Sequence, residues 1–185
     1  SYRVKTGGSL LFPKYTTYYG LRSYWYYIPS SLKNVTVTGG NINTAAFCRV
    51  PNIGVIFNGV GTIGEYAFYN GTPTSITMSE SVTSIGNAAF YGCSGLTSIT
   101  IPNSVTTIGS NAFRNCTSMT RIYVPSSVTT ISASSYSYSP FYGWNSTAII
   151  YCGASSKPSG WGAYWNYYAS GETLTVNWGA SGLPA

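Results

Sequence analysis

Two stretches of the chain, ITMSESVTSIGNAAF at Ile76–Phe90 and ITIPNSVTTIGSNAF at Ile99–Phe113, align without a gap. Corresponding residues are 23 positions apart, and a partial third copy follows at the same interval. The apolar positions that recur are Ile76, Met78, Val82, Ile85 and Phe90, then Ile99, Ile101, Val105, Ile108 and Phe113, then Ile122, Val124, Val128 and Ile131. A fixed period of this length indicates a repeat architecture.

Weaker copies extend the repeat in both directions. Towards the N-terminus the apolar positions are Leu32, Val35, Val37, Ile42 and Phe47, followed by Val60, Ile63 and Phe68. In this second copy the strand register is ambiguous between Ile53 with Val55 and Gly54 with Ile56. Towards the C-terminus, after a Ser/Tyr-rich insertion at 132–139, the matching residues are Phe141, Trp144, Thr147, Ile150 and Cys152.

Each copy has the pattern expected for one coil of a solenoid. In a short strand alternate side chains point inward, so Ile99 and Ile101 are predicted to be buried while Thr100 faces out. One coil cannot bury both of its faces, and stacking coils closes the core. We therefore predict a mainly β fold, a solenoid of about five coils of 21–28 residues that covers residues 28–152.

Two aromatic-rich segments flank this solenoid, at 1–27 and 153–185. A solenoid exposes an apolar cross-section and unpaired strand edges at each end, so the first interpretation is that both segments are caps of a single domain. The C-terminal segment is expected to contain a short helical turn at 161–168 and a final strand at 172–178. The competing interpretation is head-to-tail self-association, which does not close and gives a filament. Its candidate residues are Tyr24, Trp25, Tyr26, Trp161, Trp165 and Trp178.

The repeat resembles a known family. The pattern IPxSVTxIGxxAFxxCxxLTxI, which residues 90–131 follow closely, is similar to the BspA-like leucine-rich repeat of bacterial and protist surface proteins. The segments YYIPSSLKNVTVTGG and IIYCGASSKPSGWGAYWN resemble the flanks of bacterial members. This resemblance implies a leucine-rich repeat solenoid at a cell surface or secreted from it, with roles in adhesion and protein binding and with no catalytic residues to transfer.

Composition excludes most enzyme chemistry. The chain of 185 residues has nine Lys or Arg, three Glu, no Asp and no His. A glycosidase needs two carboxylates roughly 5 to 10 Å apart, and Glu65 and Glu80 occupy different repeat positions. We therefore predict no catalytic activity, no metal site and no cofactor. The net charge of +6 is spread out rather than clustered, so no nucleic-acid binding is expected. No apolar run reaches the roughly 18 residues of a membrane span, so no membrane insertion is expected either.

The outward strand positions form the candidate binding surface. They are Thr36, Thr77, Thr100, Tyr123 and Tyr151. Solenoids often bind partners with the surface lined by their strands, and Tyr with small hydroxyl residues is suited to contact. Thr is also simply favoured on exposed strands. The predicted partner is a protein or glycan on another surface, or a second copy of the chain, at an extracellular or cell-surface location.

Four N-glycosylation sequons begin at Asn34, Asn70, Asn115 and Asn145, about as many as chance predicts for this composition. Cys93 and Cys116 occupy equivalent coil positions, and Asn70 falls at or next to that position one repeat earlier. The family slot holds an inward Asn or Cys that satisfies backbone groups of the turn. Two stacked buried thiols are the first interpretation, and a disulfide between neighbouring coils is the alternative.

Overall fold

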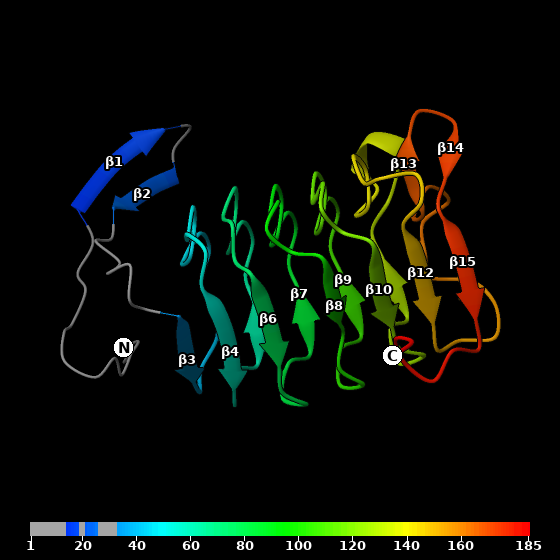
Figure 1. Ribbon diagram of the computed structural model, residues 1–185, viewed down its shortest axis with the longest axis horizontal. Coiled ribbons are helices and arrows are strands. Elements are labelled where there is room, and N and C mark those ends of the chain that lie inside the picture. Colours follow the sequence, from blue (N-terminus) through cyan, green and yellow to red (C-terminus); the bar gives the residue numbers. More distant parts are fainter. Residues whose placement is uncertain (1–13, 19–20, 26–32) are drawn as a thin grey trace.

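The computed structural model describes residues 14–18, 21–25 and 33–185. Short strands of residues 33–185 stack along one axis as a β-solenoid, whereas the strands at 14–18 and 21–25 form a separate antiparallel hairpin (Figure 1). The strands are β1 (Lys14–Tyr18), β2 (Leu21–Trp25), β3 (Asn34–Thr38), β4 (Gly54–Asn58), β5 (Thr62–Ile63), β6 (Ser75–Met78), β7 (Ser84–Ile85), β8 (Ser98–Thr100), β9 (Thr107–Ile108), β10 (Arg121–Val124), β11 (Thr130–Ile131), β12 (Ile149–Cys152), β13 (Tyr167–Ala169), β14 (Glu172–Thr173) and β15 (Thr175–Trp178). The 3-10 turn η1 spans Tyr136–Tyr138.

Two sets of parallel strands run along the solenoid. The longer strands form the sheets β3-β4-β6 and β8-β10-β12-β15, and the two-residue strands form the ladder β5-β7-β9-β11. Single bridges extend this second ladder to Ile42 at one end and to Trp161 at the other. The ladder therefore counts six successive coils, at Ile42, Ile63, Ile85, Ile108, Ile131 and Trp161.

The apolar repeat positions form one continuous core, as predicted. Ile99 pairs with Ile122 in register, and Ile122 pairs with Ile150. The phenylalanines of successive arcs stack face to face, with centroids 5.1 Å apart for Phe68 and Phe90 and 5.2 Å apart for Phe90 and Phe113. Because each ring contacts the ring one coil away, the stack holds neighbouring coils in register.

Serine explains another part of the repeat. Ser81, Ser104 and Ser127 precede the buried valine of their coils, and each hydroxyl donates to the carbonyl of the corresponding valine one coil earlier, at 2.9, 2.6 and 2.9 Å. These carbonyls lie where the chain turns between two strands, so the hydroxyl supplies the partner that a buried acceptor requires. The Ser-Val pair of the motif is therefore a coil-to-coil hydrogen bond followed by a core residue.

Each return arc contains residues in the left-handed conformation. Tyr66 and Asn70 have φ of 53° and 52°, and in the arc two coils later Asn111 and Asn115 both have φ of 58°. The arcs are joined by backbone bonds in which alternate residues donate to the next coil, such as Phe68 N to Ala89 O at 2.6 Å. Asn tolerates positive φ better than most residues, which accounts for these three asparagines in the arcs.

Several expectations are corrected. The final strand expected at 172–178 is present as β15, and its parallel pairing with β12 makes the segment after residue 152 a sixth coil, one more than the five predicted. The helical turn expected at 161–168 is absent; non-helical turns lead into β13 there. In the second coil the alternative with Ile53 and Val55 inward has the right alternation, since both are buried together with Phe57, whereas the alternative with Gly54 and Ile56 is wrong because Ile56 is exposed. Residues 1–13, 19–20 and 26–32 lie outside the described part, so the N-terminal cap stays a prediction.

Candidate functional site

The outward positions of the long strands form a row along each of the two sheets. Register places Thr36 beside Ile56 and Ile56 beside Thr77 in the first sheet. In the second sheet it places Thr100 beside Tyr123, Tyr123 beside Tyr151 and Tyr151 beside Asn177. We call these residues the strand-face row: Thr36, Ile56, Thr77, Thr100, Tyr123, Tyr151 and Asn177. All five residues predicted from the sequence belong to it.

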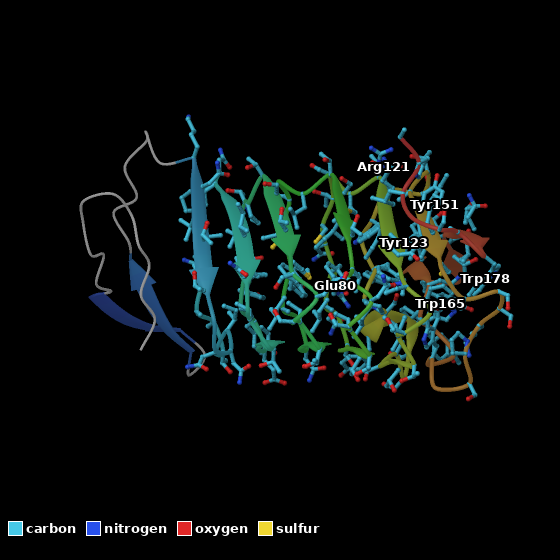
Figure 2. All side chains as sticks on the ribbon, turned by 90° about the horizontal axis from the view of Figure 1, so that it is seen from below. Glu80, Arg121, Tyr123, Tyr151, Trp165 and Trp178 are labelled. Carbon is cyan, nitrogen blue, oxygen red and sulfur yellow. The ribbon has the colours of Figure 1, made fainter. Side chains whose placement is uncertain are left out.

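The row carries no charge and changes character along its length. Thr36, Thr77 and Thr100 are exposed, whereas Tyr123 and Tyr151 are half-buried. The Tyr123 ring reaches over Gly153 of the next coil, where a Cβ would stand 2.8 Å from its hydroxyl oxygen. Three threonines and Ile56 thus occupy the N-terminal half of the row. Two neighbouring phenols, Tyr123 and Tyr151, lie in its C-terminal half (Figure 2).

Arg121 is the one cation beside the two phenols in the described strands. It precedes Tyr123 by two residues, so both side chains lie on the outward face of β10. Its guanidinium donates to the Pro184 carbonyl oxygen at 3.1 Å. This bond ties the C-terminal tail to the edge of the row and leaves the guanidinium's other donors available to an acceptor. The row together with the neighbouring Arg121 can therefore supply apolar contact, hydroxyl groups and one positive charge.

Two members of the row were missed from the sequence. Ile56 is 38% exposed and lies between two inward apolar residues, so the run Val55 to Phe57 hides the alternation of the strand. Asn177 was counted in the final strand but not in the row, because its pairing with Tyr151 could not be read from one strand alone. The alternation of polar and apolar residues in that strand, TVNW, was the signal that places Asn177 on the outward face.

The residues proposed for self-association lie in different environments. Trp161 and Trp165 are 2% and 3% exposed, so they are core residues of the sixth coil and do not present an association surface. Trp178, at 37% exposure, packs against both, with centroids 6.0 and 5.8 Å away. Tyr24 and Trp25 belong to β2, whose side chains are not described, and Tyr26 lies outside the described residues.

The four sequon asparagines also differ. Asn34, Asn70 and Asn145 are exposed, whereas Asn115 is half-buried and its Nδ2 donates to the Tyr91 hydroxyl at 3.2 Å. The Asn145 Oδ1 accepts hydrogen bonds from the backbone N–H and the hydroxyl of Thr147, at 3.0 and 2.9 Å. The four sites are therefore not equivalent as acceptors of a glycan.

The cysteines are free thiols. The thiols of Cys93 and Cys116 donate to the carbonyl oxygens of Phe68 and Phe90, at 3.2 and 3.1 Å, so this slot satisfies backbone groups of the arc. Burial raises the pKa of Cys93, and it raises that of Cys152 to about 12. Burial also raises the pKa of Cys48, against the opposing charge of Arg49.

Glu65 and Glu80 each accept a hydrogen bond from the next coil. The Glu65 Oε1 accepts from Asn87 Nδ2 at 2.8 Å, and the Glu80 Oε2 accepts from the Ser104 N–H at 3.2 Å, each across one coil boundary. Within residues 14–18, 21–25 and 33–185, no three His, Cys, Asp or Glu side chains are placed to hold a metal ion. No helix in that part of the chain is long and apolar enough to cross a membrane.

Comparison with known proteins agrees with this geometry. A search of curated proteins finds no match to the chain. The family model described as "BspA type Leucine rich repeat region" matches residues 20–142 in six copies, which is two thirds of the sequence and includes the stacked coils from β3 to β11. The chain therefore belongs to the BspA-type leucine-rich repeat family.

Proposed function

We propose that the protein is a non-catalytic extracellular scaffold that binds a protein or glycan on another surface through its strand-face row. The observation that carries the proposal is the in-register order of the outward residues in the two successive sheets, three in the first and four in the second, which supplies threonine hydroxyls, an exposed Ile56 and two adjacent tyrosines. Tyr and Thr make contact area and hydrogen bonds at low entropic cost. Membership of a repeat family that generally mediates protein interactions supports the same function.

The binding test uses the whole chain against a panel of purified extracellular matrix proteins and a glycan array. Thr100→Lys and Tyr123→Lys together introduce two charges into the row and are expected to abolish any binding that the wild type shows. Thr117→Lys with Tyr138→Lys is the matched control, since both residues are exposed and lie off the strand face. Unchanged binding by the strand-face variant would eliminate this surface.

The extracellular location rests on the surface association that is typical of this family. Mild protease treatment of intact source cells tests it. The chain is expected to be released or cleaved while cytoplasmic marker proteins stay intact. Protection of the chain until the cells are lysed would overturn the location.

A second candidate function is a self-assembling subunit of an extracellular filament. It is favoured by the open outer edge of β15 and by the partly exposed Trp178 at the same end. Head-to-tail contacts do not close, so such an assembly grows with concentration. Sedimentation and electron microscopy of the purified chain test it, and a particle of fixed size at high concentration would contradict a filament.

A further inference from the structure

The C-terminal end of the solenoid is an open sheet edge. β15 is hydrogen-bonded to β12 on one side and ends the order β15-β12-β10-β8. The tail that follows does not cover the free side, because Gly179 N donates to Ala154 O and Ala180 N to Cys152 O, both at 2.9 Å, which turns the chain back towards β12. Among the described residues, no strand pairs with the outer edge of β15.

The free backbone groups of this edge can be identified. In parallel strands alternate residues direct their N–H and C=O groups to opposite neighbours. In β12 the odd-numbered residues bond to the preceding strand β10, as the bond from Ile149 N to Thr120 O at 3.0 Å shows, and Asn177 pairs with Tyr151, so the same alternation assigns the odd-numbered residues of β15 to β12. Earlier strands follow the same rule, since the inward Val124 offers its carbonyl to Gly153 of the next coil at 2.8 Å. The peptide groups of Val176 and Trp178 therefore point out of the sheet.

Nothing in the sequence of this edge opposes pairing. Natural edge strands are blunted by Lys, Pro, bulges or inward charges, and the strand TVNW contains none of them. On its inner face Val176 is half-buried and Trp178 is 37% exposed, so apolar area also faces outward here. A partner must therefore supply both a strand and an apolar surface.

We propose that the occupant is a second copy of this chain, whose β15 pairs antiparallel with β15 about a two-fold axis at Asn177. In this register Val176 faces Trp178 of the second copy and Trp178 faces its Val176, which forms four hydrogen bonds and satisfies the outward groups of both residues. The same pairs place an indole against a β-branched side chain, a stabilising cross-strand combination. An axis at Val176 or Thr175 leaves some of these groups unpaired.

The result is a closed dimer rather than a filament. A two-fold contact uses the same patch on both copies, so assembly stops at two. Because the axis is perpendicular to the sheet, both strand-face rows lie on the same side of the dimer. The dimer can then bind a surface that carries several copies of one ligand through both rows at once. The first contact raises the effective concentration of ligand at the second row, which increases the apparent affinity. The dimer does not depend on the strand-face row being a binding site, and it competes with the filament for one edge.

Disulfide trapping tests the register. Asn177→Cys is made in a Cys48→Ser background, which removes the one native thiol that is not fully buried. Opposite residues of a non-hydrogen-bonded antiparallel pair have Cα atoms about 4.5 Å apart, within disulfide range. Mild oxidation is expected to give a covalent dimer on a non-reducing gel. Thr175→Cys is the matched control, because its copies lie about 14 Å apart along the strand and should stay unlinked.

The second test removes one outward donor. Val176→Pro deletes an N–H that is not bonded to β12, so the intrachain ladder is retained and edge strands tolerate the ring. Its dimer dissociation constant in sedimentation equilibrium is expected to rise roughly tenfold or more, whereas Val176→Thr keeps the wild-type value within about threefold. A monomeric wild type, cross-linking at Thr175→Cys in place of Asn177→Cys, or open-ended growth would each overturn the proposal. Growth into filaments would support the second candidate function instead.

Discussion

The indole nitrogen of Trp144 donates a 2.7 Å hydrogen bond to the carbonyl oxygen of Phe113, one coil earlier. Cys116 makes the corresponding contact from its thiol to Phe90, at 3.1 Å. The two side chains differ greatly in size but occupy the same repeat slot. The slot therefore selects an inward hydrogen-bond donor, and the larger indole stands in the coil that carries the insertion at 132–139.

Removing the Trp144 donor while keeping an aromatic ring is expected to lower stability. Trp144→Phe retains the contact with Phe141, now 5.0 Å between centroids, but leaves the Phe113 carbonyl without its side-chain partner. The expected loss in the free energy of unfolding is about 1 kcal/mol. Urea denaturation measures it, with Trp178→Phe as a control at a partly exposed indole. Equal losses in the two variants would contradict a role for this bond.

The buried thiol of Cys152 predicts a loss of stability at alkaline pH. Its folded pKa is about 12, above the value of about 8.5 for an unfolded cysteine. Between these values the unfolded chain releases a proton that the folded chain keeps, so stability falls as pH rises, by at most about 1.4 kcal/mol per pH unit. Urea midpoints from pH 8 to 11 for wild type and Cys152→Val measure it. Above pH 9 the urea midpoint of the wild type should fall relative to that of Cys152→Val, and a constant difference between the two midpoints would contradict the shift.

The core and the candidate row were predictable from the sequence because their information is local and repeated. The alternation of apolar and polar residues alone predicts that Ile99 is buried and Thr100 exposed, and the period of 23 residues aligns both with the next coil. The burial of Trp161 was not predictable in this way, since its indole nitrogen donates a hydrogen bond to the Val128 carbonyl oxygen, 33 residues earlier in the chain. Ile56 was hidden because its two inward neighbours, Val55 and Phe57, are apolar like Ile56 itself.

The contact between Asn70 and Gly92 predicts a glycine requirement. The Asn70 Oδ1 occupies the space where a Cβ on Gly92 would stand, and Gly92 has φ of 70°. Gly92→Ala is expected to destabilise by about 1–3 kcal/mol, from the left-handed backbone and the clash. Adding Asn70→Gly should recover the part due to the clash, which a double-mutant cycle by thermal or urea unfolding measures. Strict additivity would contradict the contact.

The phenylalanine stack predicts a graded loss along the solenoid. Phe90 is fully buried between two rings, whereas Phe47 is half-buried and stacks on Phe68 alone within the described residues, at 5.0 Å. Phe90→Ala is expected to cost about 3–5 kcal/mol. Phe47→Ala should cost about half as much, because less area leaves the core. Chemical denaturation measures both, and a larger loss at Phe47 would contradict the order.

Glycan attachment should discriminate among the sequons when the chain is secreted from a eukaryotic host. Asn145 is exposed and its Oδ1 already accepts the Thr147 hydroxyl, which leaves its Nδ2 clear of protein in a surface turn. At Asn115 the Nδ2 donates to Tyr91 and the Oδ1 lies against Gly143, so a glycan there must break an arc contact. Peptide mass spectrometry of the folded, secreted fraction is expected to show high occupancy at Asn145 and little at Asn115.

Two variants control this measurement. Asn145→Gln should remove the mass of one glycan from the secreted fraction, whereas Asn115→Gln should leave its glycan content unchanged. Substantial occupancy at Asn115 in folded protein would show that the arc accepts the modification and would contradict this order.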